Sequence, residues 1–300
     1  MIFVLLALSL YGQNDPHYSM FMFNKLAINP AYAGSKDALT FVGHYRNQWQ
    51  GIDGAPKTFT FAAHTPLFKK RVGAGLSVVS DKIGIYNITY FDMSYAYRMK
   101  VTDDATLSIG VQGQIDYTRV DWTKLDPLDS GDGMIQVNPT SKLNPNFGLG
   151  VYYSHPNYYL GASAPRVLKT SIYDTQDASA IVSVNSLRSY YLMGGLITRV
   201  NKNVKFQPGV LVTKNDNAPF EFDLNASLVF MDALWIGASY RLQDSFNAIV
   251  QYQFSKQMKA ALAVDMTLSE LRQYSPGSFE VMLEYIFLYE GARYNNIRYF

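Results

Sequence analysis

The chain has 300 residues, of which 48% are hydrophobic, 15% aromatic and only 17% charged, and its net charge is +2. That charged fraction is low against the roughly 25% of soluble domains, and without a run of basic residues the sequence does not favour nucleic-acid binding. The absence of cysteine excludes disulfides, thiolate metal sites and cysteine nucleophiles.

The first residues, MIFVLLALSLYGQNDPHYS, contain an apolar run that ends at Gly12 and is followed by Gln13 and Asn14. This run is too short to cross a bilayer and is typical of the apolar core of a secretory signal. We therefore predict that residues 1–12 are a signal peptide. The usual basic start of such a signal is missing, and a buried N-terminal strand or helix is the alternative.

From residue 37 onward, apolar and polar residues alternate along most of the chain. In FEFDLNASLVF, residues 220–230, one side of an extended chain is apolar and the other polar, apart from Val229. Such alternation predicts a β-strand with one apolar and one polar face. The same pattern predicts fourteen strands, near 37–47, 57–66, 72–80, 86–98, 104–118, 146–154, 157–163, 188–200, 204–213, 220–230, 233–242, 245–254, 258–268 and 278–290.

The connections between these strands differ in length according to their order. Those after even-numbered strands are short, whereas those after odd-numbered strands include the long segments 119–145 and 164–187. Membrane barrels combine short periplasmic turns with longer outer loops, and most of the expected strands have about the length that crosses a bilayer. A soluble sandwich has no reason to confine its long loops to one parity.

The sequence therefore predicts an all-β fold, an up-and-down antiparallel outer-membrane barrel of about fourteen strands over residues 37–290. An N-terminal periplasmic or plug segment at 13–36 precedes it, and a C-terminal tail at 291–300 follows it. A soluble barrel of this girth would have an interior too wide to fill. The apolar face is thus expected to contact outer-membrane lipid and the polar face to line a lumen. The terminal Phe300 agrees with an outer-membrane barrel, since such barrels commonly end in an aromatic residue.

Residues suited to catalysis or metal binding are few. His44 and His64 face inward on the first hairpin, where they suggest a metal pair or two polar lumen side chains. With a turn near Asp53, His44 would pair near Phe61 and His64 near Phe41, which is too far out of register for a shared metal. His155 has no nearby acid in the sequence, so the chain is not expected to be an enzyme and no cofactor is expected.

The acidic loop LDPLDSGDGMIQV suggests calcium, but it does not fit an EF-hand. Leu128 stands where the third ligand belongs and Val137 where the bidentate Glu belongs. A looser site from Asp126, Asp129 and Asp132 and a solvated turn remain as alternatives. The glycines in VGAGLSVV, GLGVYY and MGGL lie within strands, where glycine relieves crowding or permits curvature.

Four stretches together resemble the PorP/SprF family of the type IX secretion system. They are DPHYSMFMFNKLAINPAYAGS at 15–35, YRNQWQGI at 45–52, NPNFGLGVYY with the following YYLGAS at 144–163, and PGSFEVMLEYIF at 276–287. In the last stretch Phe279 replaces the family's usual His. The motif positions, for which the resemblance implies a structural or partner-binding role, are Asp15, Pro16, His17, Asn24, Asn29, Pro30, Tyr32, Gly34, Tyr45, Arg46, Asn47, Gln48, Trp49, Gly51, Gly277 and Glu280.

The resemblance implies an outer-membrane component of the secretion system. Its members are implicated in secreting or holding cell-surface proteins, including gliding adhesins with a C-terminal targeting domain. They are also implicated in linking the outer membrane to other type IX components in the periplasm. The expected partners are therefore outer-membrane lipid, a secreted or surface adhesin-type protein, and other parts of the machine.

The segment before the first strand holds NKLAINPAYAGS, whose Asn, Pro and Gly residues predict ordered but irregular structure. We expect residues 15–36 to fold into the periplasmic mouth or lumen and plug it, with Asn24, Asn29 and Tyr32 bonding lumen groups. A strap packed under the barrel is the alternative. Arg46 is expected to pair with lumen carboxylates, and Trp49 to anchor the first strand at the headgroup level or to contact a passenger protein.

Two functions follow from these expectations. In the first, the barrel is a secretion accessory whose loops 119–145 and 164–187 hold the C-terminal domain of a secreted partner. In the second, it is a porin or a transporter of hydrophobic solutes, since a barrel of about fourteen strands needs either a plug or a channel.

Overall fold

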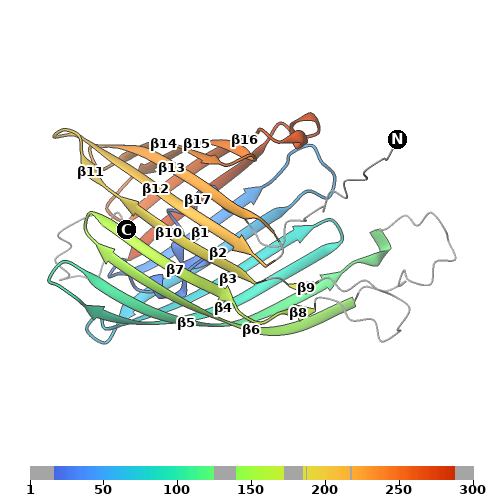
Figure 1. The fold of residues 1–300 in the computed structure, drawn as a ribbon, viewed down its shortest axis with the longest axis horizontal. Helices are drawn as coiled ribbons and strands as arrows, with labels where there is room; N and C mark the ends of the chain where they lie inside the picture. Colours follow the sequence, from blue (N-terminus) through green and yellow to red (C-terminus); the bar gives the residue numbers. More distant parts are fainter. Residues whose placement is uncertain (1–16, 125–139, 172–184, 187, 217, 288–300) are drawn as a thin grey trace, which may run out of the picture.

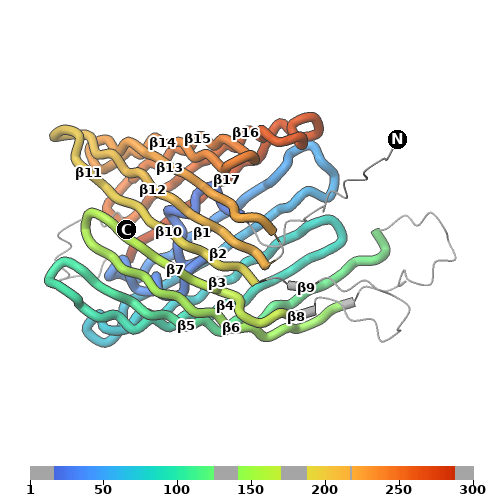
Figure 2. The backbone as a smooth tube through the Cα atoms, in the orientation of Figure 1, coloured from blue at the N-terminus to red at the C-terminus, as the bar shows by residue number. Residues whose placement is uncertain are grey.

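The structure is a computed structural model that describes residues 17–124, 140–171, 185–186, 188–216 and 218–287. Fourteen strands form a closed antiparallel barrel, drawn as a ribbon in Figure 1 and as a tube in Figure 2. The barrel closes because β1 pairs with β2 on one side and with β17 on the other, while β10 pairs with both β7 and β12. Among the described residues, no helix is long and apolar enough to span a membrane.

The first half of the barrel consists of seven strands in chain order. They are β1 (Leu39–Asn47), β2 (Lys57–Leu67), β3 (Val72–Ile83), β4 (Tyr86–Lys100), β5 (Thr106–Val120), β6 (Thr140–His155) and β7 (Tyr158–Arg166). A separate two-stranded ladder, β8 (Thr170–Ser171) with β9 (Asn185–Ser186), lies in the connection that follows β7.

The second half completes the barrel. Its strands are β10 (Ser189–Leu196), β12 (Val204–Asn215), β13 (Phe220–Phe230), β14 (Leu234–Arg241), β15 (Ser245–Gln253), β16 (Met258–Thr267) and β17 (Ser278–Phe287), and the short β11 (Thr198–Arg199) follows β10 along β12. The described 3-10 helices are η1 (Lys25–Ala27), η2 (Pro30–Tyr32), η3 (Trp122–Lys124) and η4 (Glu270–Gln273).

Each of the fourteen predicted strands is present; the expected 188–200 is interrupted at Ile197, residues 288–290 lie outside the described residues, and the other differences lie at strand ends. The largest is in β6, which begins at Thr140 instead of the expected 146. Asn144 and Pro145 fell in the expected connection 119–145, and proline is unfavourable inside a ladder because it cannot donate to it. Pro145 is tolerated here because β6 pairs only with β5 at that point, and its pairing with β7 starts at Leu149.

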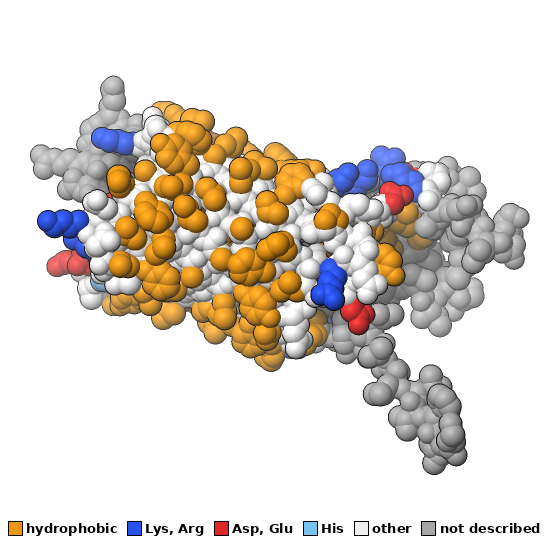
Figure 3. Space-filling view, turned by 90° about the horizontal axis from the view of Figure 1, so that it is seen from above, with side chains coloured by type: hydrophobic (Ala, Val, Ile, Leu, Met, Phe, Trp, Pro, Cys, Tyr) orange, Lys and Arg blue, Asp and Glu red, His pale blue; other side chains and the backbone are white. Residues whose placement is uncertain are grey.

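The two faces of the strands are arranged as the alternation predicts. In β13, Asp223 and Asn225 are buried, whereas Phe220 and Leu224 are 60% and 56% exposed. Figure 3 shows apolar side chains gathered over the middle of the outer surface, with charged residues toward its two ends. The apolar face therefore lies outside the barrel, where an outer-membrane protein meets lipid.

The connections define two ends of the barrel. The end with the turns that follow β2, β4, β6, β11, β13 and β15 is called the short-turn end below, and the opposite end is called the long-loop end. Much of both long connections lies outside the described residues. So do the expected signal peptide at 1–12, the tail at 291–300 with Phe300, and the carboxylates of Asp126, Asp129 and Asp132.

Candidate functional site

Residues 17–36, called the lumen segment below, lie inside the barrel and are mostly buried (Figure 2). At its start, His17 Nδ1 is 3.5 Å from Glu221 Oε2, near the long-loop end of β13. Just beyond its other end, Asp37 pairs with Lys70 at 3.1 Å and with Arg98 at 2.8 Å, at the short-turn end. The lumen segment therefore runs through the barrel from the long-loop end to the short-turn end.

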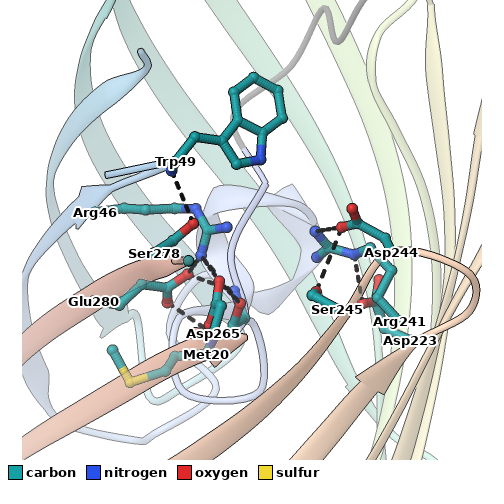
Figure 4. A network of polar contacts seen from close by, with 12 residues as sticks. Met20, Arg46, Trp49, Asp223, Arg241, Asp244, Ser245, Asp265, Ser278 and Glu280 are labelled. Carbon is teal, nitrogen blue, oxygen red and sulfur yellow. Dashed lines mark hydrogen bonds and ion pairs between the residues drawn. The ribbon is translucent and has the colours of Figure 1, made fainter. Parts of the chain in front are cut away.

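A buried group of charges holds the beginning of the lumen segment. The Glu280 carboxylate accepts the backbone N–H of Ser19 at 2.7 Å and that of Met20 at 3.1 Å. Ser19 Oγ donates to Asp265 at 2.9 Å, and Arg46 pairs with both Asp265, at 2.7 Å, and Glu280. Figure 4 shows these side chains converging from β1, β16 and β17.

Strand register explains why these residues meet. Arg46 lies directly opposite Glu280 in the β1–β17 ladder, and Asp265 lies opposite Ser278 in the β16–β17 ladder. Two carboxylates facing one guanidinium leave negative charge in a buried place, which is costly unless donors compensate it. The two N–H groups of the lumen segment, together with Ser19 Oγ, supply such donors, so wall and segment stabilise each other.

A second ion cluster, formed by β13, β14 and the turn that follows β14, lies across from the first in Figure 4. Arg241 Nε is 2.8 Å from Asp223, and Arg241 Nη1 is 3.5 Å from Asp244. These contacts join residues of the wall to one another. They therefore provide a comparison for the first cluster, whose contacts join the wall to the lumen segment.

The later part of the lumen segment packs closely against glycines of the wall. Asn29 Nδ2 donates to the carbonyl of Val151 at 3.1 Å, and Asn29 Oδ1 accepts the N–H of Ala31 at 2.9 Å. A Cβ at Gly110 would overlap the backbone of Ala31, and one at Gly150 would overlap the Asn29 side chain. The absence of a side chain at these strand positions is therefore what lets the lumen segment approach.

Polar side chains of the wall complete the contacts of this part. Ser163 Oγ donates to the carbonyl of Ile28 at 2.6 Å, and the N–H of Gly34 donates to His64 Nδ1 at 3.2 Å. The Tyr32 ring lies edge-on to His64 and to Tyr152, at 5.3 Å between centroids in each case. Backbone and rings of the lumen segment are thus both fixed.

Two lysines of the lumen segment are buried inside the barrel. Lys25 Nζ donates to the carbonyl of Met22 at 2.7 Å and lies 4.5 Å from the centre of the Tyr159 ring. Burial lowers the pKa of the Lys25 ammonium to about 7, and the nearby Lys36 adds to this. Lys36 pairs with Glu284 of β17. Lys25, Lys36, Glu284 and Trp235 line a small cavity together.

The histidines of the first hairpin do not share a site. His44 lies opposite Thr60 and His64 opposite Thr40, so the predicted partners Phe61 and Phe41 were wrong by one residue. The turn is centred one position earlier than expected, because Asn47 pairs with Lys57. His44 Nε2 contacts Glu280 at 3.0 Å. In the described part of the chain, no group of three or more His, Cys, Asp or Glu is placed to hold a metal ion.

The remaining motif positions surround the lumen segment and the long-loop end. The backbone N–H of Trp49 donates to Ser278 Oγ at 3.1 Å. The indole of Trp49 extends to the same side of β1 as Arg46 in Figure 4. Gln48 is buried, and Tyr45 packs on Phe279. The Asn24 amide nitrogen finds no hydrogen-bond partner among the described residues. Gly51 and Gly277 have positive φ, Pro30 opens η2, Asn47 ends β1, and Asp15 and Pro16 lie outside the described residues.

Sequence reasoning missed several residues of this site. Asp265, Glu284 and Lys36 were not singled out, although the alternation placed Asp265 and Glu284 on the inward face. Gly150 was recognised only as a strand glycine that relieves crowding, and Gly110 was not singled out. Their positions on the inward face of neighbouring strands are the signal that could have indicated what they make room for.

Comparison with known proteins decides the family. The model of the type IX secretion system membrane protein PorP/SprF family matches residues 10–285. The chain belongs to the PorP/SprF family. The resemblance seen in the sequence is thereby confirmed, and so is a location in the outer membrane.

Solved structures similar to this PorP/SprF chain are outer-membrane barrels. The CymD monoaromatic hydrocarbon channel aligns with a TM-score of 0.52 at 11% identity, covering 91% of this chain and 93% of that one. A Pseudomonas aeruginosa FadL homologue has a TM-score of 0.46 at 13% identity, covering 92% and 96%. At such identities the likeness concerns the fold alone. Among curated proteins, none matches the sequence of this chain.

Proposed function

We propose that this PorP/SprF protein is an accessory barrel of the type IX secretion system whose lumen is closed by residues 17–36. In this proposal the barrel holds a secreted or surface protein by its C-terminal targeting domain and contacts other parts of the machine in the periplasm. The loops that would hold the partner connect β5 to β6 and β7 to β10. The family supports the secretion role, and the filled lumen supports a role other than transport through the barrel.

The observation that carries the closed lumen is the bonding of the lumen segment both near its start and farther along, at Ile28 and Asn29. Glu280 and Asp265 hold Ser19, whereas Val151 and Ser163 hold Asn29 and Ile28. A porin needs a continuous water-filled path, and a segment buried along the length of the lumen opposes one. A transporter of hydrophobic solutes would have to displace these contacts at each passage.

Recovery of partners from outer membranes tests the secretion role. The tagged full-length chain is purified in mild detergent, and the proteins that accompany it are identified by mass spectrometry. We expect a large exported protein with a C-terminal targeting domain, a periplasmic machine component, or both. Shortening the connection between β5 and β6 should remove the exported protein and leave periplasmic components bound.

Conductance separates the accessory role from the porin alternative. In planar bilayers, the wild-type protein is expected to give no steady channel. A stable open pore, combined with recovery of the barrel alone from membranes, would contradict the proposal and favour transport. Because partner recovery and conductance are independent, failure of one leaves the other interpretable.

A further inference from the structure

Five of the turns at the short-turn end carry an exposed apolar residue, and four of these five also carry cations. Phe68 and Met231 are 78% and 76% exposed, and Val101, Val200 and Phe254 are also exposed. Seven exposed cations lie in these turns or directly beside them: Lys69, Lys70, Arg71, Lys100, Arg199, Lys202 and Lys256. We call these apolar and basic residues together the basic rim.

Opposite charges at this end are fewer. Asp103 and Asp104 are exposed on the turn after β4, and Asp232 pairs with Lys205 at 2.7 Å. Asp37 pairs with Lys70, whose side chain remains 60% exposed, and with the buried Arg98. The basic rim therefore presents an excess of positive charge.

The backbone of two of these turns is unusual for the residues that it carries. Phe68, Lys69 and Lys70 have φ of 46°, 56° and 66°, and Met231 has φ of 50°. Hairpin turns in this left-handed region ordinarily use glycine, asparagine or aspartate. The chain instead places a large apolar or basic side chain at these four positions. Turn geometry alone does not explain this choice.

The position of the basic rim relative to the apolar belt identifies what it meets. The exposed apolar residues of the wall continue to this end without interruption, through Tyr97 in β4 and Tyr252 in β15 to the turn residues. The turns belong to strand pairs on different sides of the barrel, as Figure 1 shows. A lipid leaflet surrounds a barrel on all sides, whereas a protein partner would favour one patch. In an outer membrane the short turns face the periplasmic leaflet, which is made of phospholipid.

We infer that the basic rim is a binding surface for anionic phospholipid headgroups of the periplasmic leaflet. Phe68 and Met231 enter the boundary between headgroups and acyl chains, and the neighbouring lysines contact lipid phosphates. Interfacial aromatic residues and surface lysines act in this way in other membrane proteins. This surface lies apart from the lumen and does not depend on the secretion role proposed above.

Lipid preference of the purified full-length protein tests this inference. The protein is mixed in detergent with equal amounts of phosphatidylglycerol and phosphatidylethanolamine of the same acyl chains, and bound lipid is counted by native mass spectrometry. A cation near anionic lipid typically contributes about fivefold in binding. We expect the wild type to prefer phosphatidylglycerol by about tenfold or more. Combined Lys69→Gln, Lys100→Gln, Lys202→Gln and Lys256→Gln substitutions should remove most of that preference.

A matched variant controls for charge alone. Lys57, Lys82, Lys124 and Lys169 are exposed lysines at the long-loop end, and replacing all four by Gln removes the same number of charges. This variant should retain the wild-type preference within about twofold, because its sites lie apart from the basic rim. No preference in the wild type, or equal losses in both variants, would overturn the inference and leave the rim available to an acidic protein.

A second measurement tests the apolar contacts. Phe68→Trp places a fluorescent probe in the basic rim, and Tyr274→Trp places one at the long-loop end, where Tyr274 is 72% exposed. In lipid vesicles, fluorescence added at position 68 should be quenched by lipids brominated near the headgroup and protected from iodide. Fluorescence added at position 274 should be quenched by iodide. Equal iodide quenching at both positions would contradict insertion of Phe68.

Discussion

Two parts of the lumen segment, one near its start and one around Asn29, are held by different physical means. At Ser19 and Met20, backbone and hydroxyl groups bond to the carboxylates of Glu280 and Asp265, which Arg46 also pairs. At Asn29 and Ala31, the segment packs onto Gly110 and Gly150, where any larger residue would overlap it. We call these the charged end and the glycine seat. The first depends on charge balance and the second on shape, so substitutions should release them separately.

The largest effect is expected from Glu280→Gln. The substitution removes a buried charge that pairs with Arg46 and accepts two N–H groups of the lumen segment. Breaking such a network costs about 3 kcal/mol. The charged end should then open roughly a hundredfold more often. Because the chain has no cysteine, maleimide labelling of a single Met22→Cys reporter measures this opening directly.

Asp223→Asn is the matched control for that prediction. It also breaks a buried ion pair of the lumen wall, with Arg241, whose cluster joins residues of the wall to one another. Labelling of Met22→Cys should stay near the wild-type rate even if the barrel unfolds more easily. Equal acceleration of Met22→Cys labelling by Glu280→Gln and Asp223→Asn would mean that the contacts of Glu280 do not specifically hold the lumen segment.

Gly110→Ala tests the glycine seat. The added methyl group overlaps the Ala31 backbone, and overpacking of this kind costs about 1–3 kcal/mol. Labelling of a Ser35→Cys reporter should rise more than labelling of Met22→Cys, which is the reverse of the order expected for Glu280→Gln. Gly113→Ala in the same strand is the control, because a Cβ there meets nothing within 4 Å. Equal labelling of Ser35→Cys in Gly110→Ala and Gly113→Ala would mean that close packing at Gly110 does not hold the lumen segment.

Asn29→Ala should have a smaller effect at the glycine seat. It removes the bond to the Val151 carbonyl and the cap on the Ala31 N–H, for which about 1–2 kcal/mol is typical. Labelling of Ser35→Cys should therefore rise about tenfold. Asn24→Ala provides the comparison, since the Asn24 amide nitrogen lacks a partner in the described part of the chain. An equal response would contradict the role given to Asn29.

The smallest effect concerns pH and Lys25, which lies between the charged end and the glycine seat in the sequence. Its pKa is about 7 in the lumen against an ordinary value of 10.5, so a released Lys25 binds a proton that the seated one does not between these values. Raising the pH from 7 toward 9 should therefore favour seating and slow labelling of both reporters relative to the same cysteines in the unfolded chain, whose thiolate fraction rises with pH in the same way. Lys25→Met should flatten this pH dependence. A slope of the opposite sign, or one unchanged by Lys25→Met, would contradict it.

The barrel could be predicted from the sequence because each strand carries its own signal. Alternation in stretches such as 220–230 and the parity of loop lengths need no knowledge of distant residues. The start of strand β6 could not be predicted in the same way, because Pro145 is tolerated in the ladder only where β7 does not yet pair with β6.

The lumen contacts could be predicted only in part. Pairing of Arg46 with carboxylates was expected from its inward position, but which carboxylates it meets depends on the register of β1 with β17. Asp265 belongs to a third strand, β16, and no local sequence pattern links it to Ser19. Gly110 and Gly150 acquire their importance only when the lumen segment lies against them.

Single-channel conductance with and without the lumen segment tests the account most directly. The wild-type protein and a chain lacking residues 17–36 are inserted in planar bilayers, after a heat-shift assay on gels has shown that both barrels are folded. A silent wild type and a steadily conducting deletion would agree with a lumen closed by its own N-terminal segment. A wild type that conducts as well as the deletion, or a folded deletion that stays silent, would contradict it.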